Sequence, residues 1–344
     1  MSTNPFEQRL PVIVQCFGGI GDQIAGEPVV RYLARKLSSD RPFTIRTHYP
    51  FVFRHLSEEG IEIAGYPGDV PFLDPDRLVY NVYAPGNHPK HLVIDHSLVQ
   101  STDFMALFAL RGTLPRDLRR IMLPVTLEER KSVMEKLDAS GGAELSTGNM
   151  IAVHAGKSWP TRTFPISWWN DVLNRLVCEG RTPVLIGEKI AGRGFLEVDP
   201  LHCLDLRGKL AFHETIALLD IVSDLLTNDS APVHMAGATD VRLHTLCTVR
   251  RPEIVWPYRG LDSYGRMGDR SLQPLSPSWR AWDYAKGGVF QKRERYELEL
   301  AGGRDFGPQG GEIFQSVEAS PEEIMSWLPD PRELAKMIVL REGD

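Results

Sequence analysis

The segment VIVQCFGGIGDQ, residues 12–23, places a short apolar run directly before a glycine-rich turn. The run at residues 12–16 is almost entirely apolar, which is typical of a strand that lies between helices in a parallel sheet. The turn leads into a helical stretch, and its glycines allow the backbone to approach a ligand closely. This strand, turn and helix predict the first unit of an open α/β sheet, with a ligand site at the carboxyl end of the strand.

Strand-like and helical patterns alternate along the remaining chain. Further strands are expected at residues 43–47, 61–64, 78–82, 92–94, 151–154, 183–186, 225–227 and 241–247. Helices are expected at 127–137, with Thr126 and Glu129 as a capping box, after Ser167 as N-cap, near 212–222, from about 232, and after Ser320 and Asp330. Repeated βα order implies parallel sheets and therefore an α/β fold.

The length of the chain and one polar segment predict two domains. The chain has 344 residues, and an ordinary domain has about 100–200. The segment DASGGAELSTGN, residues 138–149, is small, polar and glycine-rich, which is typical of a linker. We therefore expect a first domain at 1–140, a second at 149–315 with an irregular insertion at 250–315, and C-terminal helices at 320–344.

Composition excludes several classes of partner. The net charge is −6 and the isoelectric point is near 6.0, so no global positive field attracts nucleic acid or an anionic membrane. The four cysteines are widely separated and lack metal-binding or redox spacing, which favours a reducing cytoplasm. No apolar stretch approaches the length of a membrane span, and the first ten residues lack the apolar core of an export signal.

The first glycine-rich turn misses two known phosphate-binding motifs. A dinucleotide fingerprint can start at Gly19 and Gly21, but Ile24 replaces its third glycine. This weakens the alternative of a nucleotide-cofactor oxidoreductase of the NAD type. Gly21 and Gly26 have the spacing of a Walker loop, yet Glu27 stands where the phosphate-binding lysine belongs.

Asp22 is the acidic residue of the same turn. A carboxylate at the carboxyl end of a strand in an open α/β sheet faces the ligand crevice, where it could act as a general base. An acidic residue at a helix start also caps the helix, so a purely structural role remains open.

Two later segments carry candidate binding residues. Lys157 and Arg162 lie in the loop HAGKSWPTRTFP, residues 154–165, which can neutralise a diphosphate or form a solvated basic loop. The segment LLTNDSAPVHMAGA, residues 225–238, runs from a strand into a short helix whose free N–H groups suit an anion. Its polar residues Asn228, Asp229, Ser230 and His234 either line a pocket or serve as caps and a core histidine.

Two further groups of polar residues complete the candidates. Glu188 ends a strand and could accept ribose hydroxyls, although an exposed turn glutamate fits equally well. His88, His91, Asp95 and His96 cluster in sequence without cysteines or a helical i, i+4 pair, so we expect no metal site there.

Four blocks of sequence together carry a family resemblance. They are VIVQCFGGIGDQIAGEPVVRYLARKL (12–37), IAVHAGKSWPTRTFPISWWNDVLNRLVCEGRTPVLIGE (151–188), LRGKLAFHETIALLDIVSDLLTNDSAPVHMAGA (206–238) and ASPEEIMSWL (319–328). In this combination they resemble glycosyltransferase family nine, the lipopolysaccharide heptosyltransferases that use ADP-heptose. The resemblance implies a B-type glycosyltransferase fold, in which two Rossmann-like domains face each other across a cleft.

The resemblance also implies an activity. This is the inverting, metal-independent transfer of heptose or a related sugar from an ADP-sugar or another nucleotide sugar to a hydroxyl group. The donor is a substrate, and no cofactor is expected. The acceptor implied by the family is lipopolysaccharide, and another glycan or a protein is also open. A non-catalytic sugar-nucleotide-binding protein is the alternative outside enzymes.

Residue by residue, the resemblance assigns roles to the candidates named above. Asp22 becomes the catalytic base, Lys157 and Arg162 hold the donor diphosphate, and Glu188 binds ribose. The nucleotide pocket is formed by Asn228, Asp229, Ser230 and His234, and the loop near the reaction centre by Gly18, Gly19 and Gly21.

The chain departs from the family pattern at three places, one of which is the stretch 250–315, which does not resemble the heptosyltransferases. Ala231 stands where the family usually has glycine, and residues 248–252 replace its usual F-G-P-T turn. The identity of the nucleotide base is therefore open.

Overall fold

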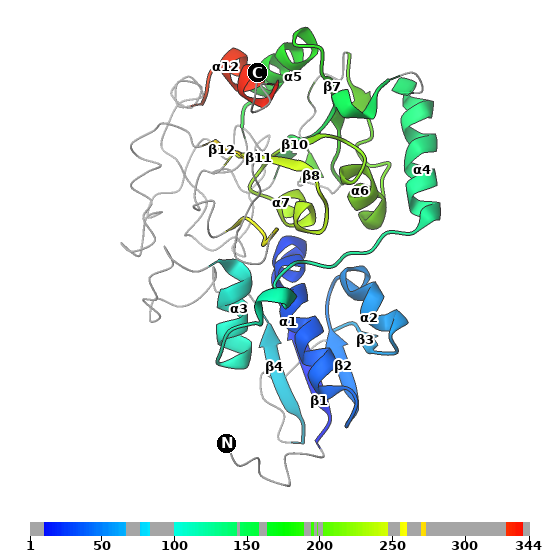
Figure 1. Ribbon diagram of the computed structural model, residues 1–344, viewed down its shortest axis with the longest axis vertical. Helices are drawn as coiled ribbons and strands as arrows, with labels where there is room; N and C mark the ends of the chain where they lie inside the picture. Colours follow the sequence, from blue (N-terminus) through cyan, green and yellow to red (C-terminus); the bar gives the residue numbers. More distant parts are fainter. Residues whose placement is uncertain are drawn as a thin grey trace.

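The computed structural model consists of two parallel β-sheets with helices packed around them (Figure 1). It describes residues 10–66, 76–82, 100–142, 145–157, 164–188, 194–195, 198, 202–246, 255–259, 270–272 and 328–339. The α/β fold class predicted from the alternating pattern is confirmed. Among the described residues, no helix combines the length and the apolar character needed to cross a membrane.

The first sheet has the strand order β3-β2-β1-β4, with every pair parallel. Its strands are β1 (Val12–Cys16), β2 (Phe43–Arg46), β3 (Glu62–Ala64) and β4 (Leu78–Val82). The helices of this half are α1 (Ile20–Leu37), η2 (Pro50–Phe53), α2 (Arg54–Glu58), α3 (Ser101–Leu110) and the short η4 (Arg116–Leu118). Because β1 lies inside the sheet, its carboxyl end opens onto the middle of the edge where a ligand is expected.

The second sheet has the order β12-β11-β10-β5-β7-β9 and is also parallel throughout. Its strands are β5 (Met150–His154), β7 (Thr182–Leu185), β9 (Leu204–Asp205), β10 (Asp224–Asn228), β11 (Arg242–Leu246) and β12 (Arg270–Leu272). The helical segments are α4 (Leu127–Leu137), η5 (Asp138–Gly142), η6 (Thr147–Asn149), α5 (Ile166–Cys178), α6 (Phe212–Leu219), α7 (Ala231–Met235), η8 (Ala236–Ala238) and α12 (Pro331–Val339). A small antiparallel pair joins β6 (Gly156–Lys157) to β8 (Gly194–Phe195).

The predicted strands agree with the structure within two residues at each end, where the structure describes them. The strand expected at 92–94 and the helix expected after Ser320 lie outside the described residues. The capping box of α4 is confirmed, since Thr126 Oγ1 accepts the Glu129 N–H at 3.1 Å and Glu129 Oε2 accepts the Thr126 N–H at 2.8 Å. The helix predicted after Asp330 is confirmed as α12, whose first turn donates to the Asp330 carboxylate.

The prediction of Ser167 as the N-cap of α5 is wrong. The helix begins at Ile166, and the carbonyl of Pro165 accepts the N–H of Trp169 at 3.1 Å, which makes Pro165 the N-cap. Its φ of −56° already suits the turn into a helix. Trp168 is buried beside Trp169, and its indole N–H donates to the Pro329 carbonyl ahead of α12 at 3.0 Å.

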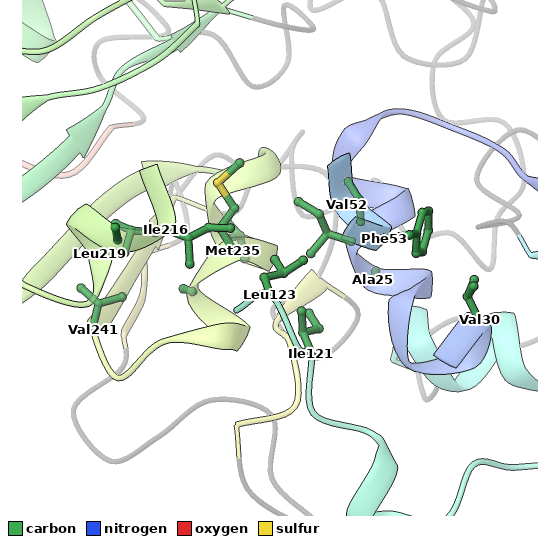
Figure 2. Packing of buried hydrophobic residues seen from close by; sticks show 14 of the residues in the cluster. Ala25, Val30, Val52, Phe53, Ile121, Leu123, Ile216, Leu219, Met235 and Val241 are labelled. Carbon is green, nitrogen blue, oxygen red and sulfur yellow. The ribbon is translucent and has the colours of Figure 1, made fainter. Parts of the chain in front are cut away.

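One apolar core connects the two sheets. The segment between α3 and α4 contributes Ile121 and Leu123 to this core, and both are buried. Figure 2 shows them between Val52 of the first half and Met235 and Ile216 of the second. The connecting segment therefore packs against both halves through these buried side chains, while most of its other residues are exposed or half-buried.

A buried acid on α1 holds the same connecting segment. Glu27 is fully buried and accepts the Arg31 Nε–H at 2.7 Å and the Met122 N–H at 2.9 Å. The guanidinium of Arg31 in turn donates to the carbonyls of Leu118 and Arg120. This explains the failed Walker motif, because the residue in the lysine position is a core carboxylate that binds backbone far along the chain.

A second charged contact joins α2 to the start of α4. Arg54 donates to the carboxylate of Glu129, the same residue that completes the capping box. The hydrogen bond from Arg54 lowers the pKa of Glu129 to about 2, against the opposing effect of burial. Glu129 therefore stays ionised at neutral pH and serves both the helix start and the contact between the halves.

Candidate functional site

The turn that follows β1 is shaped around the Asp22 carboxylate. Gly18 has φ +88°, a left-handed conformation that glycine adopts without strain. Asp22 Oδ2 accepts the Gly19 N–H at 2.9 Å, which forms the capping interaction at the start of α1. Asp22 Oδ1 accepts no hydrogen bond from the described residues, and the residue is half-buried. Asp22 is therefore not the N-cap residue of α1, which is Gly19; it accepts the N-cap N–H from the N3 position, and this structural role leaves one carboxylate oxygen for chemistry.

Gly18 also makes room for that carboxylate. A Cβ atom at Gly18 would lie 2.6 Å from Asp22 Oδ2 and 2.7 Å from Asp22 Cβ, closer than van der Waals contact allows. A side chain at this position must therefore push Asp22 away. The glycine is required by the neighbouring acid as much as by its own backbone conformation.

Polar residues of the second half meet at the carboxyl ends of β5 and β10. His154 and Thr227 are paired in the parallel register of these strands. Ser230 Oγ lies 3.1 Å from His154 Nδ1, and Asn228 Nδ2 donates to the Gly156 carbonyl at 3.0 Å. Asn228 is buried, and Ser230 is half-buried. Hydrogen bonds thus connect the residues that follow β10 to those at the end of β5, at the edge of the second sheet.

The alternative that the Ser230 side chain caps α7 is not supported by the geometry. Ser230 is the N-cap residue by its backbone position, but its hydroxyl makes no capping hydrogen bond. It lies instead against His154 and against Asn228, whose Oδ1 accepts from it at 3.2 Å. The hydroxyl therefore organises the turn rather than the helix.

The start of α1 lies close to α7 at Gly21. A Cβ atom there would lie 3.0 Å from His234 Cδ2 and 3.5 Å from the Ala231 Cα. His234 is buried, as its alternative role of a core histidine requires. In Figure 1, the start of α1 lies beside α7. The residue next to Asp22 therefore lies too close to α7 for a side chain to fit between them, and the sequence places α7 in a different domain.

The other candidate residues are described in part or not at all. The backbone of Lys157 belongs to β6, while its side chain and the whole of Arg162 lie outside the described residues, as do His88, His91, Asp95 and His96. Glu188 is exposed and lies three residues beyond the end of β7, at the same edge of the second sheet. Among the described residues it makes no hydrogen bond to the turn at Asn228.

Sequence reasoning missed His154 as part of this turn, because the pattern indicates only that the residue ends a strand. The position of His154 at the end of a strand was the available signal, because the carboxyl ends of parallel strands lie at the same edge of a sheet. Which strand lies next to β5 is decided by the fold. The contact with Ser230 could therefore not be assigned from the sequence.

Comparisons with known proteins match the chain to one family. Residues 91–270, just over half of the chain, match the model of glycosyltransferase family 9 (heptosyltransferase). The structure of a family 9 glycosyltransferase from Veillonella parvula is similar with a TM-score of 0.56 and 16% identity, covering 97% of this chain and 98% of that one. No curated protein sequence matches significantly.

Two structures of Escherichia coli proteins are also similar. ADP-heptose lipopolysaccharide heptosyltransferase II has a TM-score of 0.54 and 14% identity, covering 78% of this chain and 91% of that one. The iron-containing heptosyltransferase TibC, solved in complex with ADP-D-β-D-heptose, has a TM-score of 0.50 and 16% identity, covering 75% and 64%. These likenesses confirm the expected B-type glycosyltransferase fold.

Proposed function

Because the chain belongs to glycosyltransferase family 9, the heptosyltransferase family, we propose that it transfers a heptose or related sugar from ADP-heptose or a similar nucleotide sugar to a hydroxyl group. The transfer inverts the anomeric centre and uses neither a metal ion nor a cofactor. The observation that supports this most directly is the close approach of Gly21 to His234, where an added Cβ atom would lie 3.0 Å from His234 Cδ2, because it brings the start of α1, which carries Asp22, next to α7, which follows the turn at Asn228.

In the proposed reaction, Asp22 is the general base. Its Oδ1 takes the proton from the acceptor hydroxyl while the hydroxyl oxygen attacks the anomeric carbon. The bond between that carbon and the donor diphosphate breaks on the opposite face, and the nucleoside diphosphate leaves with the electron pair. Attack from the face opposite the leaving group inverts the configuration of the sugar.

The second half binds the donor in this proposal. Lys157 and Arg162 neutralise the diphosphate as it departs, because cationic side chains stabilise developing negative charge without a metal ion. Glu188 accepts the ribose hydroxyls. The turn with Asn228, Asp229, Ser230 and His234 lines the nucleotide pocket, a role supported by its position at the carboxyl edge of the parallel sheet.

The donor is tested by thermal stabilisation with a panel of nucleotide sugars. A ligand that binds only the folded protein raises its melting temperature by mass action. We expect ADP-heptose to raise it most, followed by ADP, with smaller shifts for UDP- and GDP-sugars. Mass spectrometry of mixtures with lipopolysaccharide core, other glycans or proteins then identifies the acceptor. A shift with NAD and none with any nucleotide sugar would overturn the proposed donor.

Replacing Arg162 by alanine is expected to weaken donor binding about tenfold or more, since charge-assisted hydrogen bonds to a diphosphate are among the strongest in proteins. Calorimetric titration with ADP measures the effect. Arg175, an exposed residue late in α5, provides the control variant Arg175→Ala. Equal affinities of the two variants would exclude Arg162 from the diphosphate site.

Replacing Gly18 by alanine is expected to lower turnover about tenfold or more, because displacement of a reacting group by a fraction of an ångström is costly in catalysis. Gly60 offers a matched control, since it has the same φ of +88° and a Cβ atom added there would meet nothing within 4 Å. Gly60→Ala therefore carries the backbone strain alone. If both variants keep the turnover of the parent protein, contact with Asp22 is not what requires glycine at position 18.

A further inference from the structure

The last carbonyl of β1 accepts two side-chain hydrogen bonds. The Tyr66 hydroxyl donates to the Cys16 carbonyl at 2.7 Å, and Gln23 Nε2 donates to the same oxygen at 3.1 Å. Cys16 closely precedes the turn that leads to Asp22, and Gln23 immediately follows Asp22 on α1. Tyr66 therefore fixes the beginning of the turn that leads to Asp22, and Gln23 connects the end of the turn to the same Cys16 carbonyl.

The hydrogen bonds continue across the edge of the sheet to the end of β2. The Thr47 hydroxyl donates to Gln23 Oε1 and accepts the Tyr49 N–H at 2.8 Å. The backbone N–H of Thr47 donates to the Ala64 carbonyl at the end of β3. Gln23 and Thr47 are both almost completely buried. The amide of Gln23 is thus fixed at both ends, and its orientation follows from the two partners.

The Tyr66 ring is held from the side by other aromatic rings. Its centroid lies 5.5 Å from that of Phe17 and 4.5 Å from that of His48. Burial raises the pKa of Tyr66 above its ordinary value. The hydroxyl is therefore protonated, and able to donate to Cys16, throughout the neutral range.

We propose that Tyr66, Gln23 and Thr47 are positioning residues for Asp22, holding its glycine-rich turn in the geometry that the transfer requires. The proposal rests on the proposed function, in which Asp22 is the base. A turn with Gly18 and Gly19 has many accessible conformations, so its geometry must be imposed from outside. The only direct hydrogen bond to the Asp22 side chain among the described residues comes from Gly19, within the turn itself. The order of the turn therefore depends on its two anchored ends.

The experiment uses Tyr66→Phe and Thr47→Val in the full chain, because each removes one hydroxyl with little change in volume. We expect kcat to fall about tenfold in each, while donor affinity stays within about twofold, since a small displacement of a catalytic group costs rate rather than donor binding. Thr47→Ser keeps the hydroxyl and is expected to restore kcat. Tyr32→Phe on α1 is the matched control, since the Tyr32 hydroxyl accepts a hydrogen bond only from the exposed Lys36 among the described residues.

A double variant separates positioning from general loss of structure. If Tyr66 acts through Asp22, adding Tyr66→Phe to Asp22→Ala leaves the residual turnover unchanged, because the effects of the two replacements are not additive. Full additivity, or unchanged kcat in both Tyr66→Phe and Thr47→Val, would overturn the proposal. If Asp22→Ala itself keeps normal turnover, the assignment of the base fails instead, so the two failures are distinguishable.

Discussion

Replacing Asp22 by asparagine is expected to lower kcat by about 100-fold or more, with donor affinity nearly unchanged, as the loss of a general base requires. Asparagine is the decisive replacement because its side-chain oxygen can still accept the N–H of Gly19, the N-cap residue of α1. The variant therefore keeps the structural role of Asp22 and loses only its basicity. Turnover at saturating acceptor and calorimetric titration with the nucleotide measure the two quantities.

Asp22→Ala should give a loss of similar size, together with the small loss of stability that follows from an uncapped helix. Asp330→Asn is the control, because Asp330 caps α12 in the other half of the chain and is exposed. Its turnover should match that of the parent protein. Normal turnover in Asp22→Asn would show that the carboxylate only caps the helix.

Replacing Glu27 by alanine is expected to lower the free energy of unfolding by about 3–5 kcal/mol, the cost of breaking a buried ion pair. The Glu27 carboxylate is fully buried, and its removal leaves the Arg31 guanidinium in the core without its charged partner. The Met122 N–H loses its acceptor as well. Urea denaturation, with the midpoint and slope analysed together, measures the change.

Glu58→Ala is the matched control for this prediction. Glu58 also pairs with an arginine four residues away, but its side chain is 65% exposed and the nitrogen–oxygen distance to Arg54 is 3.7 Å. Exposed pairs of this kind contribute about 0–1 kcal/mol. Comparable losses in Glu27→Ala and Glu58→Ala would contradict the interpretation of the buried pair as the link between α1 and the connecting segment.

The alternating pattern predicted most of the fold because apolar runs of strand length and capping residues are local signals. It identified β1 and β4 to the residue and the capping box of α4. The N-cap of α5 was missed because serine is the commoner capping residue, while here a proline provides the carbonyl. Buried charges such as Glu27 were recognised only as a broken motif, since Met122 is brought to Glu27 by tertiary packing.

The candidate site was predictable to the extent that its residues follow strand ends. Asp22 and the turn at Asn228 were found in this way. His154 and Tyr66 were missed, because their partners Ser230 and Cys16 are assigned only once the strand order is known. The meeting of Gly21 with His234 depends in addition on how the two halves pack. Local sequence therefore identifies the residues of each turn, whereas the tertiary structure determines which of these residues lie close together.

The position of α12 has a consequence for synthesis on the ribosome. Its residues Leu334 and Ile338 belong to the apolar cluster that covers α5 and one face of the second sheet, and Trp168 bonds to the segment just before it. A nascent chain that ends before residue 328 must therefore leave the tryptophans of α5 without their cover. The second half therefore reaches its native packing only after residues 328–339 have been translated.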